Sequence, residues 1–125
     1  MTPSRFVFIR SSTGAAFTLR VKYCRSFLCR LRGYTFHPPI RPDEGLLLDS
    51  GRTSRLDTAI HMLGVSFDLA VFWINDAGQV VDKTLARAWR PAYLPQAPAR
   101  YVLETHPSRL NDLQIGQIVQ FDDTP

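Results

Sequence analysis

Three side chains capable of acid–base chemistry occur in residues 54–83, otherwise one of the most apolar parts of the chain. They are Asp57, His61 and Asp68. A histidine next to a carboxylate could act as a general base if the two are within hydrogen-bonding distance. On a strand, residues four apart are separated by about 13 Å, so Asp57 reaches His61 only if that segment is helical. His61 and Asp68 face opposite sides of one strand unless Gly64 bends it.

Recognisable catalytic motifs are missing from the rest of the chain. There is no Gly-x-Ser-x-Gly, no His-Glu-x-x-His, no phosphate-binding glycine loop and no Gly-x-Gly-x-x-Gly. We therefore expect a protein that is not an enzyme, with no catalytic residue and no cofactor. A hydrolase-like enzyme that uses His61 with a carboxylate stays open as the alternative.

The two cysteines, Cys24 and Cys29, are five residues apart in "YCRSFLCRLRG". If both belong to one helix, they point to different faces and cannot form a disulfide unless the helix breaks. A zinc site needs about four ligands at characteristic spacing, which this segment does not supply. We expect free, metal-free thiols in a reducing compartment; a redox role is the alternative.

Positive charge is concentrated near the N-terminus, and the whole chain has a formal net charge of +4. Eight basic residues precede the first acid, Asp43: Arg5, Arg10, Arg20, Lys22, Arg25, Arg30, Arg32 and Arg41. Because they alternate with apolar residues, we assign them to the solvent face of strands and a helix. Nucleic-acid binding through these arginines is expected to be weak and non-specific, and it remains a second alternative.

The composition is that of a folded protein of one domain, residues 1–125, since 45% of residues are hydrophobic and 21% charged. No apolar run approaches the roughly 20 residues of a membrane helix. Polar residues interrupt the N-terminal apolar segment, so a secretory signal is not expected. We predict a cytoplasmic protein with no membrane partner.

Segments in which apolar and polar residues alternate, separated by turn residues, predict that the chain forms mostly strands. The predicted strands are 5–10, 16–23, 45–50, 66–75, 79–86, 101–104 and 116–121. Residues 66–75 are apolar on both faces, which indicates a central strand, and "NDAG" predicts a hairpin turn after it.

Two helices are predicted. Apolar residues at helical spacing, followed by Gly33, predict a firm helix over about 24–32, and Pro107 predicts a short one over about 107–113. The expected fold is mainly β (α+β): a small antiparallel or mixed β-barrel-like domain.

Residues 87–100 mix aromatic residues with three prolines, and we call them the proline-aromatic strap. Such a segment typically crosses a sheet or closes its edge. We expect a shallow pocket where His61 meets Trp89 or Tyr93, and we expect Asp68 to accept backbone hydrogen bonds or to pair with Arg30 or Arg32. These six residues are the predicted ligand-binding set. The expected role is a binding or interaction module for a protein, a peptide or a small anionic ligand.

The order of "RLRGYTFH", "EGLLL", "FDLAVFWINDAGQVVD", "PARYVLE" and "LQIGQIVQF" resembles the prokaryotic domain of unknown function family 192. The resemblance covers about residues 16–122, and "ARYVLE" at 99–104 and the turn at 33–36 are its most specific parts. It implies a compact β-rich domain built around a barrel, without a transferable activity. Asp68 matches the family pattern, whereas the chain departs from it at Gly33–Thr35 and at Ile60–Leu63.

Overall fold

Seven strands form one sheet in the structure, a computed structural model that describes residues 5–123, with the backbone alone at Phe27, Leu28, Leu31 and Asp123. The strands are β1 (Arg5–Ser11), β2 (Thr18–Cys24), β3 (Gly45–Ser54), β4 (Leu69–Ile74), β5 (Val80–Ala86), β6 (Ala99–Thr105) and β7 (Val119–Asp123). Their order across the sheet is β5-β4-β6-β3-β2-β1-β7. Only the β2–β3 pair is parallel among these strands. The predicted mainly β, mixed fold is confirmed.

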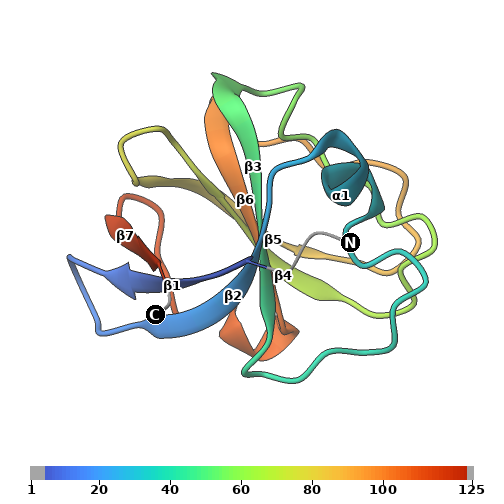
Figure 1. Cartoon of the computed structure of the whole chain (residues 1–125), viewed down its shortest axis with the longest axis horizontal. Helices are drawn as coiled ribbons and strands as arrows, with labels where there is room; N and C mark the ends of the chain where they lie inside the picture. Colours follow the sequence, from blue (N-terminus) through green and yellow to red (C-terminus); the bar gives the residue numbers. More distant parts are fainter. Residues whose placement is uncertain (1–4, 124–125) are drawn as a thin grey trace.

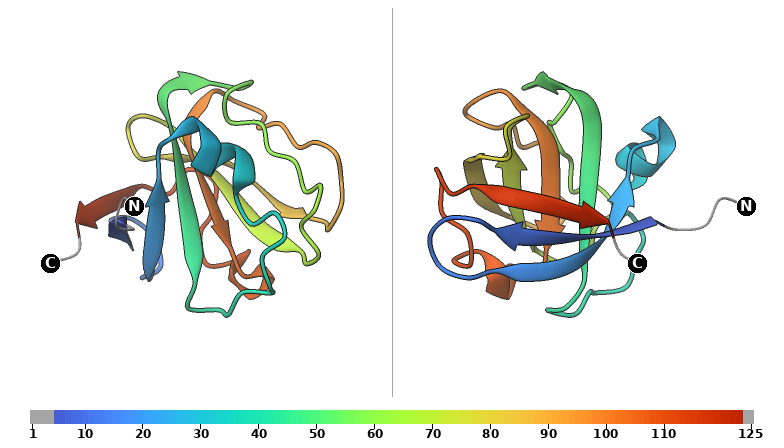
Figure 2. Two further views of the ribbon diagram at one scale, coloured as in Figure 1. Left: turned by 45° about the vertical axis from the view of Figure 1, so that its right-hand side comes forward. Right: turned by 60° about the vertical axis from the view of Figure 1, so that its left-hand side comes forward.

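The sheet curls into a half-barrel, visible in Figures 1 and 2. Its two edge strands, β5 and β7, approach each other at one end. There Val80 donates its N–H to the Gln117 carbonyl at 2.9 Å, and Val119 donates to the Gly78 carbonyl at 2.8 Å. Gly78 must be glycine, since its φ is +86° and a Cβ would lie 2.6 Å from the Val119 oxygen. These bonds protect both sheet edges at this point.

Apolar side chains are buried on both faces of the sheet. In β4, Val71 and Trp73 contribute to one core, whereas Phe72 and Ile74 contribute to the other. The prediction of a central strand with two apolar faces is therefore confirmed. The Trp73 indole N–H donates to the Thr58 carbonyl at 2.7 Å, which satisfies a fully buried donor.

The predicted helix of about 24–32 is wrong in its start and its length. Helix α1 is Phe27–Arg32, six residues, because Cys24 still belongs to β2 and Ser26 is the N-cap, accepting the Cys29 N–H at 3.2 Å. Gly33 ends the helix as predicted, with φ of +48°. The apolar face predicted from residues 27, 28 and 31 falls on side chains outside the described ones.

The second predicted helix is also shorter than expected. Only a 3-10 turn, η1 (Pro107–Arg109), forms in the predicted range 107–113. The His106 ring is its N-cap, because Nδ1 accepts the Ser108 N–H at 3.1 Å. The following residues form turns, in which Asp112 donates its N–H to the Arg109 carbonyl at 2.9 Å. A helix ladder therefore does not propagate beyond this turn.

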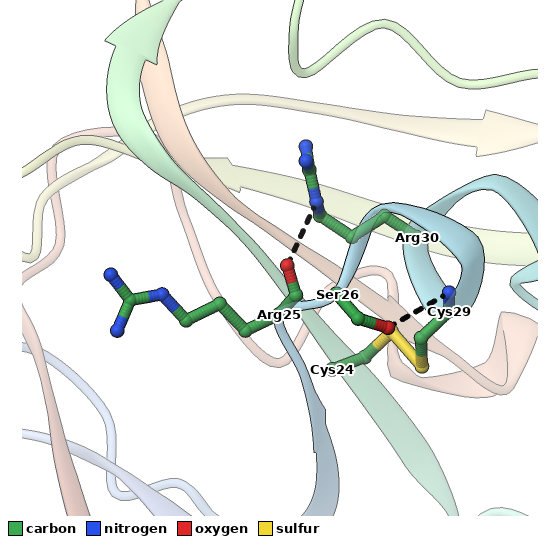
Figure 3. Close-up of a disulfide and its surroundings, with 5 residues drawn as sticks. All are labelled: Cys24, Arg25, Ser26, Cys29 and Arg30. Atoms are coloured by element: carbon green, nitrogen blue, oxygen red, sulfur yellow. Dashed lines mark hydrogen bonds between the residues drawn. A yellow bond between two sulfur atoms is a disulfide. The ribbon is translucent and has the colours of Figure 1, made fainter.

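Cys24 and Cys29 form a disulfide, so the prediction of free thiols is wrong (Figure 3). Their Cα atoms are 5.8 Å apart, within the range that a disulfide spans. The prediction assumed one continuous helix, in which these residues would diverge. Because Cys24 ends β2 and the chain turns at Ser26, Cys29 on α1 comes back over the strand end.

Figure 1 shows how the chain distributes its connections around the sheet. Helix α1 and the segments 55–68 and 87–98 gather at one side, whereas the turn that joins β4 and β5 lies at the other. The two segments pair with each other, since Ile60 and Tyr93 form a β-bridge and Trp89 donates its N–H to the Met62 carbonyl at 3.0 Å. Together they cover the core that contains Trp73.

Candidate functional site

A cleft of about 520 Å³ opens between α1, β3, β6 and the segment that follows β3. Its apolar walls include Leu48, Ile60, Val65 and Val102, and its lining is completed by Gly33, Tyr34, Ser50, Leu56, Thr58 and Ala59, together with the charged and titratable groups described below. This volume is in the range of small-molecule sites, which combine apolar walls with few polar groups. The cleft is therefore the candidate site.

Glu104 is the buried acid of the cleft. It lies on β6, where Val102 faces the same way into the core under α1 and Leu103 faces the opposite core. Only 4% of Glu104 is exposed, and its Oε1 has no hydrogen-bond partner in the described part of the chain. Burial without a compensating partner raises the pKa of Glu104 to about 7. The carboxyl therefore changes charge close to neutral pH.

Three arginines line the cleft at its exposed edge, and we call them the basic rim: Arg30, Arg32 and Arg52. Arg30 Nε donates to the Arg25 carbonyl at 3.2 Å (Figure 3), and Arg52 Nε contacts Asp57 Oδ2 at 2.5 Å. The hydrogen bond from Arg52 lowers the pKa of Asp57. The rim thus carries three positive charges against one exposed carboxylate, which favours an anion at the cleft mouth.

Some of the predicted ligand-binding residues line this cleft. His61 is half-buried and lines it with Arg30 and Arg32. Trp89 and Tyr93 do not line it: Trp89 is 57% exposed, and the Tyr93 hydroxyl accepts the Arg87 N–H at 2.8 Å. The prediction that strap aromatics meet His61 in one pocket is thus not matched by the cleft's lining. A ligand-binding role for the six predicted residues stays a prediction.

Asp68 lies just before β4 and outside the cleft. It accepts the Ala88 N–H at 2.9 Å, so the predicted backbone hydrogen bond is confirmed. Its ion pair is with Arg87 at 3.2 Å and not with Arg30 or Arg32. The prediction chose helix arginines because it did not account for the strap returning past the start of β4. Asp68 therefore fastens the strap, and it does not tie the helix to the sheet.

Glu104 was not among the predicted site residues. The signal was available in part, because "ARYVLE" ends an apolar strand with an acid that alternation places on the face of Val102. What the sequence could not show is that no cation lies opposite it. No ion pair among residues 5–123 reaches Glu104.

The N-terminal basic residues lie mostly on the solvent face, as predicted. In β2, Arg20 and Lys22 are exposed, whereas Leu19 and Val21 between them are buried. Several make contacts within the chain: Arg10 pairs with Asp122 at 2.6 Å, and the Arg20 guanidinium lies 3.9 Å from the centre of the Phe6 ring. Part of the basic set is thus engaged within the chain, and weak, non-specific nucleic-acid binding stays a prediction.

The described structure contains no helix long and apolar enough to cross a membrane. Its fold is that of a small β half-barrel domain, and the cleft lies beside the short helix α1. The family model described as "Uncharacterized ACR, COG1430" (DUF192) matches residues 8–121. The chain belongs to this family, so the resemblance expected from the sequence is confirmed.

Two archaeal relatives show how far the similarity extends. A UPF0127 protein of Thermococcus gammatolerans is 30% identical over 93% of this chain and 75% of its own length. One of Thermococcus sibiricus is 33% identical over 78% of this chain, but the match spans 61% of that protein. Relatives thus include chains longer than the matched region.

Two crystal structures share the fold. A protein of Sinorhizobium meliloti, described as a candidate transcription regulator, has a TM-score of 0.81 at 20% identity and is covered over 94% of its length, with 95% of this chain. A protein of unknown function from Novosphingobium aromaticivorans has a TM-score of 0.75 at 16% identity, covering 92% of this chain and 83% of that one. At these identities the likeness is one of fold.

Proposed function

We propose that the protein is a binding module whose cleft takes a small anionic ligand with an apolar body. The observation that carries the proposal is the combination of apolar walls with the basic rim in one cleft of about 520 Å³. The walls favour burial of a hydrocarbon segment, and the guanidinium groups of the rim favour a carboxylate or phosphate at its outer end. Leu56, which is 77% exposed, adds apolar surface to the lining of this cleft.

A binding role fits the hydroxyl groups of the cleft better than nucleophilic catalysis does. Ser50 Oγ donates to the Arg100 carbonyl at 2.8 Å, and Thr58 Oγ1 donates to the Ser54 carbonyl at 2.7 Å. Both hydroxyls are thus occupied with the backbone, whereas a nucleophile needs a base to accept its proton.

Acid–base catalysis is the second candidate, and one observation favours it. His61 and Glu104 line the same cleft, and burial raises the pKa of Glu104 to about 7, near the value that a general acid or base needs at neutral pH. This is the hydrolase-like alternative with Glu104 as the carboxylate. Turnover of a bound ester or amide probe, lost in Glu104→Gln, would establish it in place of simple binding.

The test of binding is a titration of the full chain with hexanoate and with hexanol, followed by two-dimensional NMR. We expect hexanoate to bind with a dissociation constant on the order of 1 mM, with shifts confined to the cleft, and hexanol to bind more weakly. The double variant Arg30→Gln/Arg32→Gln should weaken hexanoate several-fold, and added salt should do the same.

Arg41→Gln is the control for each single substitution, Arg30→Gln or Arg32→Gln, because Arg41 is exposed, pairs with Asp43 at 3.2 Å and does not line the cleft. It should bind hexanoate as the wild type does. Equal weakening in the control and in the single cleft variants, or shifts spread over the whole basic surface, would show that the arginines act as a general positive field and not as a site.

A further inference from the structure

We propose that Glu104 receives an uncharged hydrogen-bonding group at the inner end of the ligand, so that the cleft takes small anions carrying a second polar group such as a hydroxyl or an amide. The inference rests on the proposed binding function and adds the chemistry of the ligand's inner end. It assigns to Glu104 the role of the residue that determines specificity.

The first argument is the unpartnered oxygen. Buried polar atoms in native proteins nearly always have a hydrogen-bond partner, because an unsatisfied one loses its hydration without compensation. Two other buried polar groups near the cleft follow the rule: the Thr58 hydroxyl donates to the Ser54 carbonyl, and the Trp73 indole N–H donates to the Thr58 carbonyl. Glu104 lines the cleft and is only 4% exposed. Its Oε1 atom has no hydrogen-bond partner among the described residues. A ligand group is the partner that this position can still acquire.

The second argument concerns charge. The charged and titratable groups that line the cleft with Glu104 are the basic rim, Asp57, His61 and Tyr34. Burial and the negative charges of Glu104 and Glu44 raise the pKa of the Tyr34 phenol. None of the rim arginines forms a described ion pair with Glu104. A neutral carboxyl can both donate and accept, which matches a hydroxyl or an amide. A charged inner group would have to lose its hydration against the same apolar walls.

The third argument is that the approach to the oxygen is kept open. Gly33, which ends α1, is the residue whose added Cβ would lie 3.4 Å from Glu104 Oε1. Its φ of +48° already favours glycine. A larger side chain here would occupy the space next to the carboxyl, so the helix end leaves room for a ligand group at Glu104.

The experiment compares four probes that share a carboxylate and differ at the other end: hexanoate, 6-hydroxyhexanoate, the monoamide of adipic acid and 6-aminohexanoate. The full chain and the variants Glu104→Leu and Glu104→Gln are titrated at pH 6, where the wild-type carboxyl is mostly protonated. We expect the hydroxyl and amide probes to bind the wild type about fivefold tighter than hexanoate. That advantage should vanish in Glu104→Leu and persist in Glu104→Gln, whose amide also donates and accepts.

The outcomes separate the two proposals. If all four probes bind the wild type equally, the cleft binds anions but Glu104 does not read the inner end, and the inference is wrong. If 6-aminohexanoate binds tightest, Glu104 is a site for a cation and the inference is also overturned. If none binds, the proposed function fails and the inference fails with it. Should Glu104→Leu not fold, the wild-type ranking and Glu104→Gln still decide.

Discussion

Asp49 on β3 and Glu104 on β6 are two buried acids on neighbouring strands, and they have opposite environments. Asp49 is 1% exposed and Glu104 is 4% exposed. Asp49 accepts hydrogen bonds from Arg100 Nε at 3.0 Å, from the Gly51 N–H at 2.8 Å and from the Tyr23 hydroxyl. Glu104 Oε1 has no such partner in the described chain.

The partners reverse the effect of burial on acidity. Burial alone would raise the pKa of Asp49, but the hydrogen bonds from Arg100, Tyr23 and Gly51 lower it below its usual value. For Glu104 burial acts unopposed, and its pKa rises to about 7. Tyr23 shows the other side of the Asp49 cluster, because burial and its hydrogen bond to Asp49 raise its pKa to about 12.

The comparison teaches that burial does not decide whether an acid is structural. Asp49 links β2, β3 and β6 through its hydrogen bonds with Tyr23 and Arg100. These bonds stabilise the folded chain without any ligand. The Glu104 carboxyl is buried beside a cleft without a hydrogen bond to Oε1, which costs folding free energy. Such a local cost is typical of functional sites, where it is tolerated for binding or chemistry. Three changes test this contrast, and a fourth tests the disulfide; they follow from the largest expected effect to the smallest.

Removing the cation from the Asp49 cluster should have the largest effect. Arg100→Ala leaves a buried carboxylate without its ion pair, and we expect a loss of about 3 to 5 kcal/mol in the free energy of unfolding, measured by urea denaturation. Arg41→Ala is the control, because its guanidinium is exposed and its pairs with Asp43 and Glu44 lie at the surface. Equal, small losses in both variants would show that Asp49 does not depend on Arg100.

Glu104 should make stability fall as pH rises. Its pKa is about 7 in the folded chain against 4.5 for an ordinary glutamate, so between these values the folded state binds more protons than the unfolded state. The stability contribution is complete below pH 4.5 and is lost as pH rises through 7. Relative to Glu104→Gln, which does not titrate, the wild type should lose about 3 kcal/mol by pH 8. A difference that stays constant with pH would contradict the raised pKa.

The strands could be predicted because their signal is local. In β2 the alternation of apolar side chains fixes the face that each residue takes, in β4 an unbroken apolar run indicates a central strand, and Gly78 marks the hairpin turn between β4 and β5. The start of α1 could not be placed in the same way. Cys24 fits the helical spacing and also the end of a strand, and only the pairing of β2 with β3 decides for the strand.

The site could be predicted only in part for a related reason. His61, Arg30 and Arg32 were recognised from residue type, which the sequence shows directly. Whether an acid is satisfied depends on which cations reach it, and those come from distant segments: Arg100 lies 51 residues from Asp49. No periodicity in the sequence distinguishes Asp49 from Glu104. That distinction needs the folded arrangement.

Removing the disulfide should lower the free energy of unfolding by an intermediate amount. Cys24 and Cys29 close a loop with a sequence separation of 5, so constraint of the unfolded chain should contribute about 2 kcal/mol. Urea denaturation of Cys24→Ala/Cys29→Ala should show this loss, and treatment of the wild type with a phosphine reductant should approach it. Mass spectrometry after alkylation checks the bond itself. Alkylation of both thiols without reductant would restore the earlier prediction of free cysteines.

Asp68 is a third acid, intermediate between the fully partnered Asp49 and the unpartnered Oε1 of Glu104. Its replacement should have the smallest effect on the free energy of unfolding. Its side chain is 32% exposed, and it accepts one backbone N–H from Ala88 and pairs with the exposed Arg87. Asp68→Ala should cost about 1 kcal/mol, because the Ala88 N–H loses its partner. Asp68→Asn should stay close to the wild type, since its amide oxygen can still accept that N–H and an exposed ion pair contributes little. His61→Ala should also leave stability nearly unchanged. If Asp68→Asn were as damaging as Asp68→Ala, charge and not backbone hydrogen bonding would fasten the strap, and Asp68 would belong with Asp49.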